Sequence, residues 1–245
     1  MRRSVTRHAS FGAAAVFLLL CTWQGSDVAA HVAEALESDY SVFSHGVRVG
    51  EFRSVCSPSS HEGRKALKFE ARTRIHAGFV VYSYDLETKE DALVGDEGTV
   101  RYQRSTRENG TSTEVEGVLD HGRFLLNITE NGVRRTMKVN RDDYDYTTME
   151  CPETRLQREG EERVLRLLDL ETLSVVTRRY RWVKSEDVTV DGKRLHCRVI
   201  DFEDPNKKCR RWVSTGEPGV IITRQDGKGK SGSYSLRMTH LKDGA

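Results

Sequence analysis

The chain has 245 residues and a formal net charge of +2, from 39 basic and 37 acidic side chains. Residues 1–30 hold three of the arginines and one aspartate, which leaves 36 basic and 36 acidic residues in the remainder. A chain without net charge has no overall field that gathers nucleic acid or an anionic membrane, so the composition argues against both as partners. With four prolines and no low-complexity tract, residues 31–245 are expected to form a single domain.

The first 30 residues have the three parts of a cleavable secretory signal peptide. Arginines at positions 2, 3 and 7 form a basic start, an apolar run follows from Phe11 to Leu20, and small residues at 28–30 precede the cleavage position. The apolar run is too short to cross a bilayer core, which takes about 20 residues. The mature protein is therefore expected to begin near His31, outside the cytosol and without a membrane span.

Lipid anchorage at Cys21 is the less favoured alternative. A lipoprotein would carry its lipid on this cysteine, but the three leucines before it place a bulky side chain where that processing prefers a small one. We expect cleavage after residue 30 instead, so that Cys21 is removed with the signal.

From Asp39 onward, stretches rich in β-branched and aromatic residues alternate with glycine-containing turns, which is typical of antiparallel sheet. The clearest hairpin is centred on Asn131-Gly132, a pair that readily adopts the positive φ angles of a type I′ turn. This centre places Phe124 opposite Val139 and Leu126 opposite Met137, so one face of the ribbon is apolar.

A second hairpin is centred on Asp191-Gly192 and places Val188 opposite Leu195. Further turns are expected at 109–110, 121–122 and 226–227, each an Asn-Gly, His-Gly or Asp-Gly pair. The expected strands are 40–43, 49–55, 65–74, 82–92, 100–106, 111–119, 123–129, 133–140, 174–189, 194–202, 209–214, 220–225 and 233–239. Serial pairing of these strands predicts a mainly β domain with a strongly curved antiparallel sheet or half-open barrel.

Two segments are candidates for helix. Residues 31–38 are expected to make two helical turns after the cleavage position. Residues 159–170 carry apolar side chains in a charged setting, and their pattern fits either helix or strand.

Four cysteines remain after signal removal: Cys56, Cys151, Cys197 and Cys209. An even number in an exported protein predicts two disulfides, and the preferred pairing is Cys56 with Cys151 and Cys197 with Cys209. The second pair brackets a turn at 204–206, but a tight hairpin there would face Cys197 toward residue 214. Metal ligation is not expected, because zinc sites use more closely spaced cysteine pairs.

Three stretches, in this order, resemble a bacterial envelope domain of unknown function allied to the lipoprotein-sorting carriers LolA and LolB. The resemblance spans about residues 39–240. Its motifs are Asp39-Tyr40-Ser41-Val42 with Gly46 and Val49-Gly50-Glu51-Phe52; the leucine-rich run at 165–173 with the hairpin at 188–192; and Arg211-Trp212-Val213-Ser214 with Gly216 and Val220-Ile221-Ile222.

This resemblance implies a periplasmic protein with a half-open antiparallel barrel wrapped around a helix. Carriers of that kind shield acyl chains from water in an apolar concavity and use no reactive groups. If the chain encloses such a concavity, its bulky aromatic residues are candidates for the lining: Phe79, Tyr82, Tyr84, Trp182 and Trp212. The four cysteines and the absence of a LolB-type lipoprotein start depart from the pattern.

No catalytic, cofactor-binding or metal-binding motif is found in the sequence. The Gly-x-Ser-x-Gly elbow of many hydrolases is absent, as are the glycine-rich phosphate-binding motifs. The acidic cluster Asp142, Asp143 and Asp145 lacks the glycine of a calcium loop. No cofactor is therefore assigned.

The leading hypothesis is an exported, non-enzymatic protein that binds or carries an apolar ligand, such as a lipid or acyl chain. The alternative is a structural or protein-interaction module of the cell envelope whose sheet edges dock a partner chain. A hydrolase whose site is not visible in sequence order is the third.

Overall fold

The computed structural model describes residues 35–79, 82–216, 219–229 and 232–243. The predicted signal peptide and Cys21 lie outside the described residues. The strands are β1 (Leu36–Ser44), β2 (Val47–His61), β3 (Arg64–Phe79), β4 (Tyr82–Gly95), β5 (Gly98–Glu108), β6 (Thr111–Asp120), β7 (Arg123–Glu130), β8 (Val133–Asn140), β9 (Tyr146–Thr147), β10 (Glu162–Asp169), β11 (Ser174–Val190), β12 (Lys193–Glu203), β13 (Lys207–Gly216), β14 (Gly219–Gly229) and β15 (Gly232–Asp243). Two short 3-10 segments, η1 (Arg141–Asp143) and η2 (Pro152–Arg155), flank β9.

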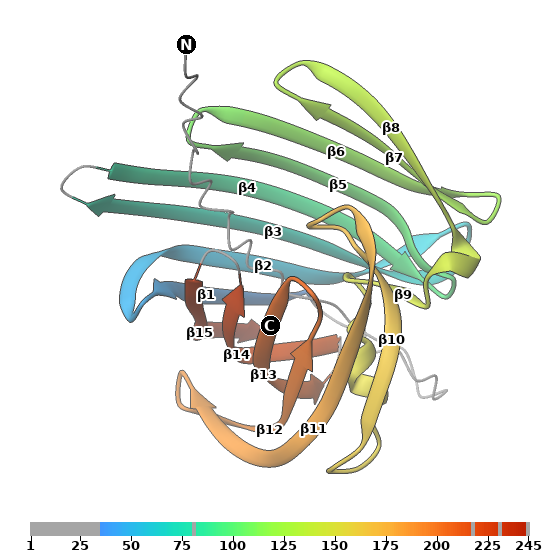
Figure 1. Cartoon of the computed structure of the whole chain (residues 1–245). Coiled ribbons are helices and arrows are strands. Elements are labelled where there is room, and N and C mark those ends of the chain that lie inside the picture. The colour runs from blue at the N-terminus through green and yellow to red at the C-terminus, as the bar shows by residue number, and fades with distance from the viewer. Residues whose placement is uncertain (1–34, 80–81, 217–218, 230–231, 244–245) are drawn as a thin grey trace.

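All fifteen strands belong to one sheet, in the order β8 to β1 followed by β15 to β9. Neighbours in sequence pair in antiparallel fashion, and β1 pairs with β15, so the first and last strands join two halves of the sheet. Figure 1 shows β2 to β8 as a broad curved sheet, with β10 to β15 curling beneath it. The strands β8 and β9 are consecutive along the chain yet form the two opposite edges.

The sheet overlaps itself and does not close. Residues near β9 and β10 return to β5 through side-chain contacts: Thr99 Oγ1 lies 2.7 Å from Thr147 Oγ1, and Arg104 donates to the carbonyl of Leu170 at 2.8 Å. We call this contact the seam. No backbone hydrogen-bond ladder joins the strands there, and β6 to β8 extend past it. The predicted fold class, a single mainly β domain with a strongly curved antiparallel sheet, is confirmed.

Side-chain alternation places the apolar residues inside the curve. On β7, Phe124, Leu126 and Ile128 are fully buried, while the residues between them are partly exposed. On the first two strands, Tyr40 and Phe52 pack edge to face with ring centroids 5.3 Å apart. The main core therefore lies on the concave side of the sheet, as a period of two residues requires.

Both predicted hairpin registers are confirmed. Phe124 pairs with Val139 and Leu126 with Met137, while Val188 pairs with Leu195. The φ angles of Asn131 and Gly132 are +47° and +83°, as a type I′ turn demands.

The turn expected at Asp226-Gly227 is wrong, because both residues lie within β14. Gly227 pairs with Tyr234 on β15, and a Cβ atom built at Gly227 would lie 2.3 Å from the tyrosine ring. A glycine is needed here because the backbone of β14 lies close to the Tyr234 ring. In the sequence, such an Asp-Gly pair looks the same as a turn.

The helix expected at 31–38 is wrong for its described residues, because 36–38 belong to β1. For 159–170, where the pattern fits either helix or strand, residues 162–169 form strand β10, which pairs along its whole length with β11. The helix implied inside the half-barrel does not occur within 35–79, 82–216, 219–229 or 232–243, where only the two 3-10 segments are helical. In that part of the chain there is also no helix long and apolar enough to span a membrane.

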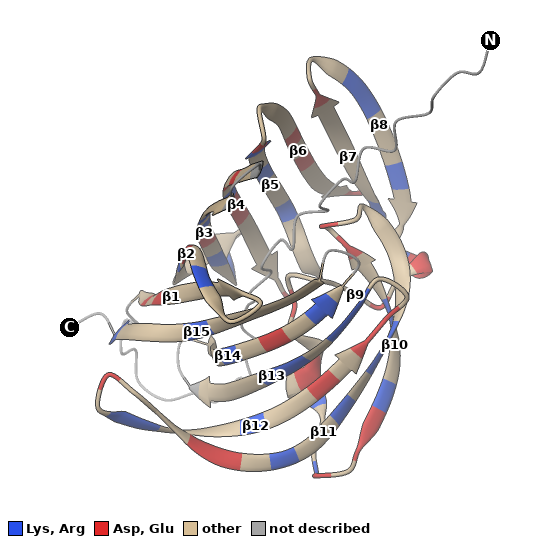
Figure 2. Cartoon of the chain, turned by 60° about the vertical axis from the view of Figure 1, so that its left-hand side comes forward, with Lys and Arg blue, Asp and Glu red and all other residues tan. Residues whose placement is uncertain are grey.

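Strands of the first half carry many charged residues (Figure 2), and several of their exposed side chains form pairs. Lys68 lies 2.9 Å from Glu70, and Arg74 lies between Glu51 at 3.7 Å and Glu87 at 3.8 Å. Exposed pairs of this kind contribute at most about 1 kcal/mol each, so their main effect is to make the outer face polar.

Candidate functional site: a buried charge network inside the curl

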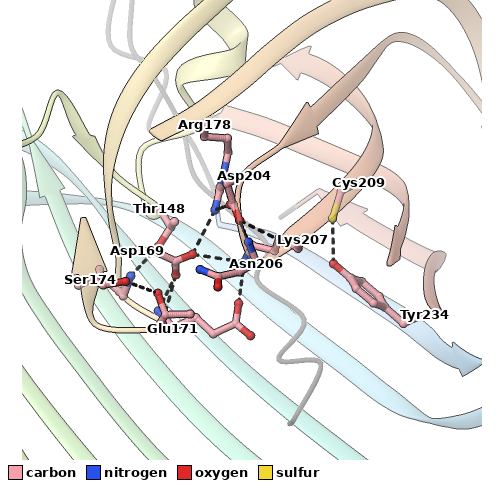
Figure 3. Close-up of polar contacts among 12 residues, drawn as sticks. Thr148, Asp169, Glu171, Ser174, Arg178, Asp204, Asn206, Lys207, Cys209 and Tyr234 are labelled. Atoms are coloured by element: carbon pink, nitrogen blue, oxygen red, sulfur yellow. Dashed lines mark hydrogen bonds and ion pairs between the residues drawn. The ribbon is translucent and has the colours of Figure 1, made fainter. Parts of the chain in front are cut away.

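The second half of the sheet buries an unusual number of charged side chains on its concave side. We define two groups. The Arg178 cluster consists of Asp169, Glu171, Arg178, Asp204 and Lys207, and the Arg211 cluster consists of Glu153, Cys209, Arg211, Gln225 and Tyr234. Figure 3 shows how the residues of the first cluster point toward one another from different strands and turns.

Arg178 lies at the centre of the first cluster. Its Nη2 atom is 3.1 Å from Asp169 Oδ2 and 2.7 Å from Asp204 Oδ2, and the side chains of both aspartates have no exposed surface. Burial by itself lowers the pKa of Arg178, but Tyr180 and the two aspartates outweigh it and raise that pKa. The guanidinium therefore stays charged and neutralises two carboxylates that could not be buried alone.

Lys207 extends the cluster toward Glu171. Its Nζ atom is 2.6 Å from Glu171 Oε2 and 3.5 Å from Asp169 Oδ2. Burial raises the pKa of Glu171, and the attraction of Lys207 opposes that rise. Three carboxylates thus surround two cations in a region shielded from water.

Turn chemistry positions the two aspartates. Asp204 Oδ1 accepts the backbone amides of Asn206 at 2.8 Å and Lys207 at 3.0 Å, which closes the β12–β13 hairpin and leaves Oδ2 for Arg178. Asp169 Oδ1 similarly accepts the amide of Glu171 at 2.9 Å. One oxygen of each carboxylate therefore builds a local turn while the other joins the long-range network.

The Arg211 cluster fills the neighbouring space. Arg211 donates to Glu153 Oε1 and, through Nε, to Gln225 Oε1 at 2.7 Å; Gln225 Nε2 in turn donates to the Tyr234 hydroxyl at 2.8 Å. The Tyr234 hydroxyl lies 3.3 Å from Cys209 Sγ. Burial raises the pKa of Cys209, so its thiol is not activated as a nucleophile at neutral pH.

The two clusters leave almost no empty volume. The cavity bordered by Glu153, Arg178, Lys207 and Arg211 measures about 10 Å³, which is room for one water molecule. Its walls are polar, and Glu153 Oε2 has no hydrogen-bond partner among the described residues. A single water is the occupant that fits this space, while an acyl chain does not.

A third buried group ties the first half of the sheet to the same interior. The Tyr102 hydroxyl donates to Glu90 Oε1 at 2.6 Å, and burial raises the pKa of Glu90 to about 7. Arg104, the cross-strand neighbour of Glu90, donates to the carbonyl of Leu170 in the β10–β11 turn. Buried polar groups therefore lie within the interior on both sides of this contact.

Of the five aromatic residues predicted as ligand lining, Tyr84, Trp182 and Trp212 make contacts in separate places. Phe79 and Tyr82 pair at the end of the β3–β4 hairpin, and Tyr84 donates its hydroxyl to Glu108 at 3.0 Å. Trp182 packs against the main core under Arg198, whose guanidinium lies 4.4 Å from its ring. Trp212 belongs to a separate cluster with Cys197 and Val199.

The predicted Cys197–Cys209 disulfide is wrong. Cys209 pairs with Phe202, five positions from Cys197, so the two cysteines lie on opposite faces of the β12–β13 ribbon and about 16 Å apart along it. A disulfide needs Cα atoms within about 7 Å. Neither Cys197 nor Cys209 forms a disulfide with a described residue. Cys56 and Cys151 are both buried in the main core, and pairing between them stays a prediction.

The charged interior was missed in the sequence, although one signal was present. Alternation along β11 places Arg178 between Val176 and Tyr180 on the buried face. A charged residue in an apolar stripe indicates a buried partner, but its partners Asp169 and Asp204 belong to turns that the alternation does not connect with it.

Larger hollows lie at the rims of the sheet. One of about 600 Å³ is bordered by Val49, Ile75 and Leu86 together with charged side chains. Another, of about 800 Å³, lies where the β2–β3, β4–β5 and β6–β7 hairpins end and carries charges of both signs. Both are open grooves.

No group of three or more His, Cys, Asp or Glu side chains suited to a metal ion occurs among the described residues.

Comparison with known proteins identifies the fold but no activity. No family model matches the sequence, and none of the curated proteins matches it. The structure is similar to the crystal structure of a beta-barrel-like protein of Domain of Unknown Function DUF1849 from Brucella abortus, with a TM-score of 0.59 and 11% sequence identity. The match covers 86% of this chain and 98% of that chain. At this identity the likeness shows the fold alone, and a relation to LolA or LolB stays a prediction.

Proposed function

We propose that the chain is an exported, non-enzymatic interaction module of the bacterial envelope, which docks a partner protein on its outer surfaces. The observation that carries this proposal is the packing of the curl. Ligand sites for molecules of lipid size measure about 300–1,000 Å³, whereas the space between the Arg178 and Arg211 clusters is about 10 Å³.

The network also suits the domain for docking. It joins β10, β11, the β12–β13 turn, β14 and β15 by charge-assisted contacts that leave little freedom to rearrange. A rigid surface loses little conformational entropy when a partner binds, so it reaches a given affinity with fewer contacts.

Export is the first part of the proposal to test. A reporter enzyme that becomes active only after export is fused behind residues 1–40. We expect activity with the natural sequence and loss of activity when Leu18 and Leu19 are replaced by Arg, because a charged run cannot act as the apolar part of a signal. Equal activity of both fusions would contradict export through this segment.

The docking function is tested on protein isolated from its own cells. Native mass spectrometry of residues 31–245 is expected to show a mass without bound lipid, and mild chemical crosslinking before lysis is expected to capture a defined heteromeric complex. Stoichiometric lipid on the protein, with no crosslinked partner, would contradict the proposal.

One observation favours a second candidate, the apolar-ligand carrier. The open groove at Val49, Ile75 and Leu86 falls within the volume range of ligand sites. A carrier that uses it would bind an environment-sensitive apolar dye, and palmitate would displace the dye. Ile75→Glu should abolish dye binding, while Val118→Glu, at an exposed apolar position on β6, should leave it unchanged.

A further inference from the structure

Strand β8 forms an edge of the sheet with one side open. It pairs with β7 alone, and no other described strand lies beyond it. Six of its eight residues are exposed, and Val133 is 72% exposed. Figure 2 shows β8 at the outermost position of the upper sheet.

The β7–β8 turn determines which backbone groups face the open side. In its two-residue type I′ turn, Glu130 and Val133 form a hydrogen-bonded pair, and such pairs recur at every second residue. Residues 133, 135, 137 and 139 therefore bond to β7. The amide and carbonyl groups of Arg134, Thr136 and Lys138 point away from it and offer a ladder for one more strand.

The side chains along this ladder are basic. Arg134, Arg135 and Lys138 are all exposed, β8 contains no acidic residue, and none of the three forms an ion pair within the described residues. On β3, by contrast, the exposed cations Lys68, Arg72 and Arg74 each face a glutamate. The edge of the sheet thus combines unpaired backbone groups with uncompensated positive charge.

This charge decides which strand fits. Antiparallel addition of β8 from a second copy would bring arginine and lysine side chains against one another, and like charges on adjacent strands are unfavourable. An extended segment with acidic residues at alternate positions would place its carboxylates on the face of the sheet that carries Arg134 and Lys138. Basic residues on an edge strand thereby exclude self-association while admitting an acidic strand.

The opposite edge offers no equivalent ladder. Strand β9 has two residues, Thr147 has no exposed surface, and Thr99 and Glu150 hold its side chain and amide. Of the two terminal strands of the sheet, β8 is therefore the one that offers a ladder.

We propose that β8 receives an extended acidic segment of a partner protein as an added, sixteenth strand. This inference rests on the proposed docking function and names its surface and the chemistry of its partner. The segment contributes backbone hydrogen bonds to residues 134, 136 and 138, and its carboxylates face Arg134 and Lys138.

Binding is measured with a fluorescent eight-residue peptide that alternates glutamate with valine, added to residues 31–245 at low salt. We expect saturable binding that weakens with added salt and is about tenfold weaker in the variant R134E/K138E. The matched control K89E/R101E makes the same charge change at exposed positions on β4 and β5 of the same convex face. Equal weakening in both variants would overturn the proposal, since it would indicate attraction to net charge alone.

Hydrogen exchange separates strand addition from loose adsorption. Saturating peptide should slow exchange of the amides of residues 134, 136 and 138 and leave those of 113, 115 and 117 unchanged. Thr136→Pro removes an outward amide that β7 does not use, so it should weaken binding while the chain stays folded, as judged by circular dichroism. Binding without protection of the three amides would overturn the proposal.

A photo-crosslinking amino acid placed at position 136, compared with one at exposed Ser105, tests the edge in cells. Capture at 136 of a protein whose linked segment is acidic and extended supports the proposal. Capture of a second copy at position 136 overturns the proposal. Capture of a partner at position 105 only also overturns it, but leaves the proposed docking function standing. Failure to capture any partner at either position, together with lipid-loaded protein, would overturn both.

Discussion

Asp204 Oδ2 lies 2.7 Å from Nη2 of Arg178, and both side chains are almost fully withdrawn from solvent. The residues are 26 positions apart in sequence and meet because the β12–β13 turn folds over the concave face of β11. A buried carboxylate paired in this way depends on its cation, because the cost of burying an uncompensated charge is several kcal/mol.

Arg178→Ala should therefore destabilise the domain by about 3–5 kcal/mol, since it leaves Asp169 and Asp204 without their common cation. The adjacent Arg179 is exposed and lies 3.8 Å from Glu203, so Arg179→Ala should change the free energy of unfolding by about 0.5 kcal/mol or less. Urea denaturation at neutral pH measures both. Equal losses in the two variants would show that the buried pair has no special role.

Glu90 should make stability depend on pH. Burial raises its pKa from the ordinary 4.5 to about 7, so the folded state binds this proton more tightly than the unfolded chain does. The contribution is complete below about pH 4.5 and is lost as the pH rises through 7, with a total loss of about 3 kcal/mol. Glu90→Gln removes the titration, so wild type should lose stability relative to this variant between about pH 5 and pH 8.

The control for this prediction is Glu108→Gln, which changes another carboxylate that accepts a tyrosine hydroxyl, here from Tyr84. Urea denaturation of all three proteins at several pH values provides the comparison. A difference between wild type and Glu90→Gln that stays constant with pH would contradict a raised pKa for Glu90.

Peptide mapping without reductant should reveal no link between Cys197 and Cys209, because the two residues occupy opposite faces of the ribbon. If the exported protein contains a disulfide between Cys56 and Cys151, the mass of that linked peptide should persist in Cys197→Ser. Detection of a Cys197–Cys209 peptide would require a shift of the β12–β13 register.

Gly227→Ala should cost about 1–3 kcal/mol, because its Cβ would lie 2.3 Å from the Tyr234 ring and force that ring away from Gln225 and Cys209. Gly229→Ala, two residues along the same strand, meets only the Asn206 carbonyl at 3.5 Å and should be tolerated. Thermal unfolding of both variants tests the contrast. In the double variant with Tyr234→Ala, the cost of Gly227→Ala should fall.

The sequence by itself determined the hairpins. At Asn131-Gly132 and Asp191-Gly192, turn chemistry fixes the centre and alternation fixes the face, so the pairs Phe124–Val139 and Val188–Leu195 follow from information within about 16 residues. The curved antiparallel sheet follows from a series of such local units.

Only the tertiary structure decided the pairing of β1 with β15, the strand conformation of 162–169 and the contents of the curl. The neighbours that satisfy Arg178 and Arg211 come from segments 9 to 58 residues away, and a local pattern cannot specify which distant charges will meet. Gly227 makes the same point, since its role depends on the ring that crosses it on the next strand. Non-local pairing of charge therefore placed the Arg178 and Arg211 clusters beside the apolar core.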